Sequence, residues 1–258
     1  MRLNQLKITW NFKYGYTKNG PWFDAGEETT EHELYITYRP SYRGFSPHHR
    51  PWKTVLRRAC SYAHGADAII EVSRRVATGI YDSLELRYYS SGSHSWYYNF
   101  QIQLWKMLKE GWVDCMDGSN YYTILMRWLG INANQIKINE DPRRDQGFYY
   151  TTLRPISASD NHTVGWLVRN RTKRGSNWWN FHQVGILGDE QHGTLGSHIY
   201  DPIIKINEID PTVPTNMIRD DYKRALFDPV PYRDPKNPKM DRVGKFPWHV
   251  AALVRKVI

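Results

Sequence analysis

The chain has 258 residues, of which 40% are hydrophobic and 14% aromatic, and its formal net charge is +9. It contains no run of about 18 apolar residues, so we expect no membrane-spanning helix, and its first residues lack the apolar stretch of a signal peptide, which makes the cytoplasm the default location. The basic residues are spread along the chain, which favours a solvated basic surface over a nucleic-acid site.

Residues 1–50 are predicted to form a β-rich N-terminal extension. Apolar and polar residues alternate from Leu6 to Trp10 and again from Leu34 to Tyr38, which is the period of a half-buried strand. Asn19-Gly20-Pro21 between them is typical of a turn. Residues 40–51, which are rich in proline, are expected to form a loop.

Residues 51–210 are predicted to form the core, which begins with helices. Apolar residues recur at helical spacing from Trp52 to Ala63, from Ile69 to Gly79 and from Phe100 to Leu108. Residues 84–89 between the second and third of these segments are expected to form a strand.

A fourth helix is predicted to begin at Cys115. Asp114 can cap it, Asp117 completes a variant of the capping box, and Gly130 stands where a left-handed C-terminal cap belongs. A helix N-terminus presents unpaired N–H groups and partial positive charge, both of which favour a thiolate. Cys115 is therefore a candidate nucleophile.

After Gly130 the apolar period changes to two. Strands are predicted at Ile136–Ile138, Phe148–Leu153, Val164–Val168, Phe181–Leu187 and Ile199–Ile203. Helices followed by antiparallel strands indicate the α+β class, with the helix of Cys115 packed on an antiparallel sheet. Residues 211–258 are rich in proline and charge, and we expect them to wrap the surface of one compact unit.

Two of these strands carry candidate partners for Cys115. His182 and Asp201 each lie on the apolar face of their strand, so the two side chains become neighbours if the strands pair. Histidine is the usual base for a thiol nucleophile, and a carboxylate orients the imidazole and stabilises its charged form.

The chain resembles the transglutaminase-like superfamily in three places. Val113-Asp114-Cys115-Met116-Asp117, continued by Leu125 to Ile131, is similar to the helix that the nucleophilic Cys opens and that ends in Arg-x-Leu-Gly-Ile. Phe181-His182-Gln183-Val184 and Tyr200-Asp201-Pro202 resemble the His and Asp strands, in the same order. The resemblance implies a papain-like core and a Cys-His-Asp triad. Many members have small residues after the Cys, whereas Met116-Asp117-Gly118 stands here, so the subfamily stays open.

An oxyanion hole needs donors in addition to the backbone N–H of Cys115. In the superfamily the second donor is often an upstream Trp or Gln side chain, and the candidates here are Trp96, Gln103 and Trp112. Trp178 and Trp179 are candidates for the wall of the substrate cleft, with hydrophobic packing as an equal alternative.

These patterns predict thiol-dependent acyl transfer on amide bonds of a protein or peptide substrate. Hydrolysis by a cysteine protease or a glutamine deamidase is the first hypothesis. The alternatives are a transglutaminase that cross-links proteins and a non-catalytic module that binds peptide or glycan on the same fold. No cofactor is implied, and no Cys and His spacing completes a metal site.

Overall fold

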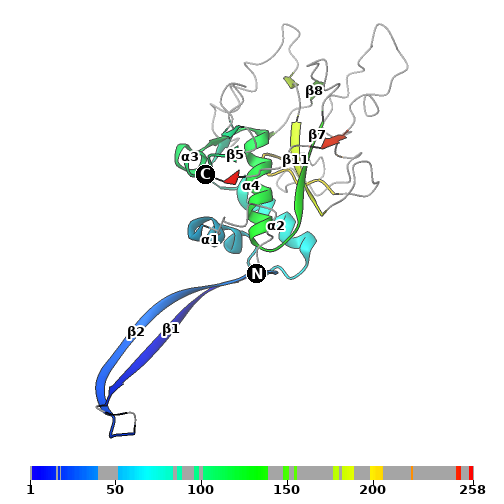
Figure 1. The fold of residues 1–258 in the computed structure, drawn as a ribbon. Coiled ribbons are helices and arrows are strands. Elements are labelled where there is room, and N and C mark those ends of the chain that lie inside the picture. Colours follow the sequence, from blue (N-terminus) through cyan, green and yellow to red (C-terminus); the bar gives the residue numbers. More distant parts are fainter. Residues whose placement is uncertain are drawn as a thin grey trace, which may run out of the picture.

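The computed structural model describes residues 2–15, 17, 19–39, 52–83, 86–88, 96–98, 101–138, 148–150, 154–155, 177–179, 182–188, 198–205, 222, 248–250 and 256–257. These residues form helices and strands arranged in several small sheets (Figure 1). None of the helices in these ranges is long and apolar enough to cross a membrane.

The N-terminal residues form a long antiparallel hairpin, as the alternation predicts. Strands β1 (Arg2–Tyr14) and β2 (Phe23–Ile36) pair along their whole length and extend away from the helices as an arm (Figure 1). Tyr38 was predicted inside the second strand but follows its end. The backbone N–H groups of Tyr38 and Arg39 donate instead to the carbonyl of Leu129, at 3.0 and 3.3 Å.

Three helices precede the helix of Cys115. They are α1 (Lys53–Tyr62), α2 (Ile69–Tyr81) and α3 (Leu104–Glu110). Helix α2 ends at Tyr81, close to Gly79 as predicted. A Cβ at Gly79 would lie 2.3 Å from Cγ of Tyr62, so this glycine allows the close contact between α2 and α1. The helix predicted from Phe100 begins only at Leu104.

The helices and sheets other than the β1–β2 arm are called the body. Helix α4 (Cys115–Trp128) lies at the centre of the body (Figure 1), and nearly all of its residues are buried. Helices α1 and α2 pack against it, and so do strands β7 (Ala133–Ile138) and β11 (His182–Leu187). Near its end, Nε of the buried Arg127 donates to the carbonyl of Ala133 at 2.9 Å. This bond ties the helix to the first residue of β7.

The sheet beside α4 has the order β11-β7-β13, with all pairs antiparallel. Its edge strand β13 (Trp248–Val250) and the short β14 (Lys256–Val257) come from the C-terminal segment. Strand β14 pairs in parallel with β5 (Gln101–Ile102), which stands where the start of a helix was predicted. The segment that was expected only to wrap the surface therefore contributes to two sheets.

The other strands are short. Strand β3 (Arg87–Tyr88) pairs in parallel with β6 (Trp112–Val113), and β4 (Tyr97–Tyr98) pairs antiparallel with β5. Strand β8 (Phe148–Tyr150) pairs with β10 (Asn177–Trp179). Strand β9 (Arg154–Pro155) pairs with β12 (Ile204–Lys205). Of the strand predicted over 84–89, only β3 is described as strand. The predicted strand Val164–Val168 and residues 151–153 lie outside the described residues.

Candidate active site

Cys115 is the first residue of α4, and the predicted capping box is present. Oδ1 of Asp114 accepts a hydrogen bond from the backbone N–H of Asp117 at 2.7 Å. The backbone N–H of Asp114 in turn donates to Oδ2 of Asp117 at 3.4 Å. Both carboxylates thus serve as caps, and the backbone at Cys115 is held in place from both sides.

His182 and Asp201 are neighbours, as the strand pattern predicts. The expected strand at Ile199–Ile203 is reduced to one antiparallel bridge, in which Tyr200 pairs with Gly185 of β11. That bridge places Asp201 beside the start of β11, where its Oδ2 lies 2.7 Å from Nε2 of His182. Both side chains are fully buried. The backbone N–H of Ile203 donates to the other carboxylate oxygen, Oδ1, at 2.9 Å.

Tyr222 completes this group, and the sequence analysis did not find it. Its hydroxyl donates to Oδ2 of Asp201 at 2.6 Å, and its ring lies nearly parallel to the imidazole of His182, with 6.4 Å between the centroids. Tyr222 is fully buried. It lies in a segment without apolar periodicity, so no local pattern marked it. Its contacts with both partners indicate a positioning residue.

The hydrogen bonds at Asp201 determine the tautomer of His182. An ionised carboxylate only accepts hydrogen bonds, so Nε2 of His182 carries the hydrogen that it shares with Asp201. In the neutral imidazole Nδ1 is then the basic nitrogen. This is the arrangement that a general base needs when a carboxylate orients it.

The thiol of Cys115 accepts a hydrogen bond from the backbone N–H of Gln183, which follows His182 in β11. Burial raises the pKa of the Cys115 thiol well above its ordinary value, and the charges of Asp114, Asp201 and Asp117 raise it further. A hydrogen bond from the backbone of Gln183 opposes them. Burial and three carboxylates therefore oppose the stabilisation of a thiolate that was expected from the helix N-terminus.

Gln183 has a structural role that was not predicted from the sequence. Its Nε2 donates to Oγ of Ser119 in α4 at 2.8 Å, and also to Oε1 of Gln135 in β7 at 3.3 Å. These side chains are buried between the helix and the sheet. Because buried polar networks fix one arrangement of their elements, this network holds β11 in register with the first turns of α4. His182 is thereby kept at a constant position relative to Cys115.

The tryptophan and glutamine candidates lie at different places. The Trp96 indole N–H donates to the carbonyl of Trp112 at 2.9 Å, and the two rings are 4.3 Å apart, so Trp96 supports the strand that leads into Cys115. Gln103 precedes the first residue of α3 but makes no side-chain capping bond, and its backbone N–H donates to the carbonyl of Trp96 at 3.0 Å. Trp178 and Trp179 belong to β10, but their side chains lie outside the described part of the chain.

Replacing Asp114 with Asn is expected to stabilise the fold at pH 7. Burial raises the pKa of Asp114 from 3.8 to about 6, against hydrogen bonds from the Asp117 and Met116 backbone that lower it. The folded chain then holds this proton more tightly than the unfolded chain, so stability falls as the pH rises from 3.8 to about 6. Asn caps a helix as well as Asp does and cannot ionise. Urea unfolding should show a gain of about 1–3 kcal/mol at pH 7 and none at pH 3.5. Equal effects at both pH values would contradict this reading.

Replacing Tyr222 with Phe is expected to lower the reactivity of Cys115 about tenfold, because a hydrogen bond to a charged group is lost while the ring remains. The proton on Nε2 of His182 should shift in the NMR spectrum, which a purely structural role would not require. Tyr222→Leu, which removes the ring as well, serves as comparison and should also destabilise the fold. An unchanged histidine signal and unchanged reactivity in the Phe variant would remove Tyr222 from the site.

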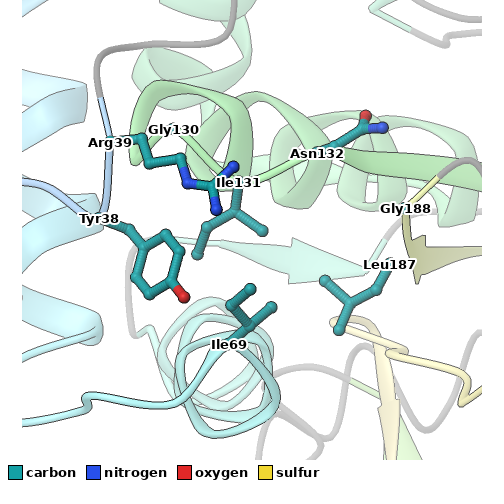
Figure 2. A pocket seen from close by; sticks show the side chains of 8 residues that line it. All are labelled: Tyr38, Arg39, Ile69, Gly130, Ile131, Asn132, Leu187 and Gly188. Atoms are coloured by element: carbon teal, nitrogen blue, oxygen red, sulfur yellow. The ribbon is translucent and has the colours of Figure 1, made fainter.

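One pocket lies at the opposite end of α4 from Cys115. It has a volume of about 270 Å³ and is lined by Tyr38 and Arg39, by Ile69, and by the segments 130–132 and 187–188 (Figure 2). A helix of this length spans about 20 Å, which separates the pocket from the thiol. It is therefore not the cleft of the Cys115 site.

No protein-family model matches the chain, and no curated protein matches it. Within the described ranges, His, Cys, Asp and Glu side chains form no group of three or more that could hold a metal ion. The geometry around Cys115, His182 and Asp201 is thus the basis for a functional assignment.

Proposed function

We propose that this protein is a thiol-dependent acyltransferase of the transglutaminase-like kind that acts on amide bonds, with water as the acceptor. The observation that carries the proposal is the buried hydrogen bond from His182 to Asp201, 2.7 Å long, together with the hydrogen bond from the backbone of the next residue, Gln183, to the thiol that opens α4. Asp201 and Tyr222 orient the imidazole, so that Nδ1 receives the proton of Cys115 as the sulfur attacks.

The reaction follows from these roles. The sulfur of Cys115 forms a bond to the carbonyl carbon while its proton passes to His182. His182 then protonates the leaving amine, or ammonia from a glutamine side chain, and the C–N bond breaks. Water attacks the thioester with His182 as base, which releases the acid and restores the thiol. The backbone N–H of Cys115 is one donor for the oxyanion.

A non-catalytic binding module on the same fold is the second candidate, and the burial of the thiol favours it. Cys115 is only 6% exposed, and burial raises the pKa of its thiol. An unreactive structural cysteine has both properties. The two candidates differ in whether His182 activates the sulfur.

Alkylation by iodoacetamide tests the proposal with an internal reference. Burial also raises the pKa of Cys60, to about 11, and Cys60 lies in α1 as a core residue. We expect Cys115 to react at least about tenfold faster than Cys60 in the folded protein at pH 7, and His182→Ala to remove the difference. Equal rates at the two cysteines would reject the enzyme and leave the binding module.

The acceptor is tested separately with dimethylcasein and monodansylcadaverine. Ammonia release or new N-termini without dye incorporation would indicate hydrolysis. Incorporation of the dye would identify a cross-linking transglutaminase in place of a hydrolase.

A further inference from the structure

The arm formed by β1 and β2 has one apolar face and one polar face. Alternation along β1 and the register with β2 place seven large apolar side chains on the same face, each 42–50% exposed: Leu6, Trp10, Phe12, Tyr14, Phe23, Leu34 and Ile36. The opposite face carries Lys7 paired with Glu31 at 2.8 Å and, near the body, Glu33 within 3.4 Å of Lys53 in α1. The apolar face thus points away from the helices that the arm contacts.

The apolar face is large enough to form an interface with a partner. Each of the seven side chains has a surface of about 200 Å² and leaves nearly half of it in solvent. Together they expose on the order of 600 Å² of apolar surface, which is the upper end of the range for the largest apolar patch on a monomer. Two such faces together would bury on the order of 1,200 Å², which reaches the range of specific interfaces. An isolated two-stranded hairpin is also marginal in water, and a second layer would stabilise it.

The charge of the arm indicates what kind of partner can cover its apolar face. Strand β2 holds five acidic residues, Asp24, Glu27, Glu28, Glu31 and Glu33, against three basic residues in β1. An anionic membrane surface attracts basic segments, so this arm is poorly matched to one. Glu28 lies on the apolar face itself, opposite Trp10, and no ion pair is recorded for it within the described residues.

A second copy of the arm supplies a partner for Glu28. His32 lies on the same face of the same strand, where its Nε2 is 2.7 Å from Oγ1 of Thr30. Four residues of strand separate Glu28 from His32 by about 13 Å, too far for contact within one copy. Consider a two-fold axis that lies between the two stacked faces, perpendicular to the strands and level with the paired residues Ile8 and Thr30. This axis brings each Glu28 beside the second copy's His32. The same axis stacks Trp10 on the second copy's Leu6.

We propose that two copies of this chain associate through the apolar faces of their arms, antiparallel and face to face about the Ile8–Thr30 pair. The two bodies then lie at opposite ends of the stacked arms. This inference is independent of the chemistry at Cys115.

Sedimentation equilibrium of the full chain across micromolar concentrations tests the association. We expect a monomer–dimer equilibrium whose dissociation constant rises about thirtyfold or more in Trp10→Lys, the effect of losing a central aromatic anchor. Thr9→Lys is the matched control, since Thr9 lies on the same strand and opposite face, where its hydroxyl meets that of Thr29. A monomer at all concentrations, or equal effects of the two variants, would overturn the proposal.

Charge reversal tests the antiparallel arrangement. Glu28→Lys and His32→Glu should each weaken the dimer, and the double variant should recover it, because the exchanged charges meet again across the two-fold axis. Absence of recovery would overturn the arrangement. Flotation with vesicles of phosphatidylcholine and phosphatidylserine adds a further check: a monomer that floats with the vesicles would assign the apolar face to a membrane and overturn association with a second copy.

Discussion

Replacing Asp201 with Asn is expected to slow the acylation of Cys115 by p-nitrophenyl acetate by on the order of 10²- to 10⁴-fold at neutral pH. The carboxamide has the same shape, but its NH₂ group donates where Oδ2 now accepts from His182 at 2.7 Å. Nε2 must then act as acceptor, so the hydrogen moves to Nδ1. The nitrogen that should take the thiol proton is thereby blocked. The release of p-nitrophenol and the mass of the acetylated protein measure the rate.

Two comparisons separate this effect from simple loss of structure or charge. Asp67→Asn removes the same charge from an exposed residue between α1 and α2 and should leave the rate unchanged. His182→Ala should cost about as much as Asp201→Asn, and the double variant little more, because residues that act as a unit are not additive. Strictly additive losses, or full activity of Asp201→Asn, would contradict the assignment of Asp201 as the residue that orients His182.

The start of α4 could be predicted from local sequence because its determinants are local. Asp114 and Asp117 are three positions apart, which is the spacing of a capping box, and both of its hydrogen bonds are present. The proximity of His182 and Asp201 followed from a period of two in each strand. It also required those strands to pair, which the sequence suggested only through apolar faces.

Other parts of the site depend on contacts between distant segments. Tyr222 reaches Asp201 from 21 positions away, out of a segment with no periodic pattern. Strand β5 stands where helix was predicted, and it pairs with β14 at the far end of the chain as well as with the neighbouring β4. The raised pKa of Cys115 depends on burial by several elements and on Asp201. Local propensity carries no information on any of these, and at Cys115 burial and nearby carboxylates oppose the effect expected of a helix N-terminus.

Replacing Gly118 in α4 with Ala is the second change for which we expect a large effect. Two opposing contributions decide whether it raises or lowers the stability of the fold. Alanine in place of a helical glycine usually stabilises a protein by about 1 kcal/mol. Here an added Cβ would lie 2.1 Å from Cδ1 and 2.4 Å from Cγ1 of Ile203, which is fully buried. Overpacking of a well-filled core costs about 1–3 kcal/mol, so we expect Gly118→Ala to destabilise the fold.

The same substitution should also lower the reactivity of Cys115, although it adds only a methyl group. The backbone N–H of Ile203 holds Oδ1 of Asp201 at 2.9 Å, so a displaced Ile203 moves the carboxylate that orients His182. Ile203→Ala removes both atoms that the new methyl would meet. The double variant Gly118→Ala/Ile203→Ala should therefore be more stable and more reactive than the two single changes predict, as measured by urea unfolding and acylation rate in a double-mutant cycle. Additive effects in both measurements would mean that Gly118 does not act through Ile203, and that the contact between α4 and the Asp201 segment does not set the geometry of the site.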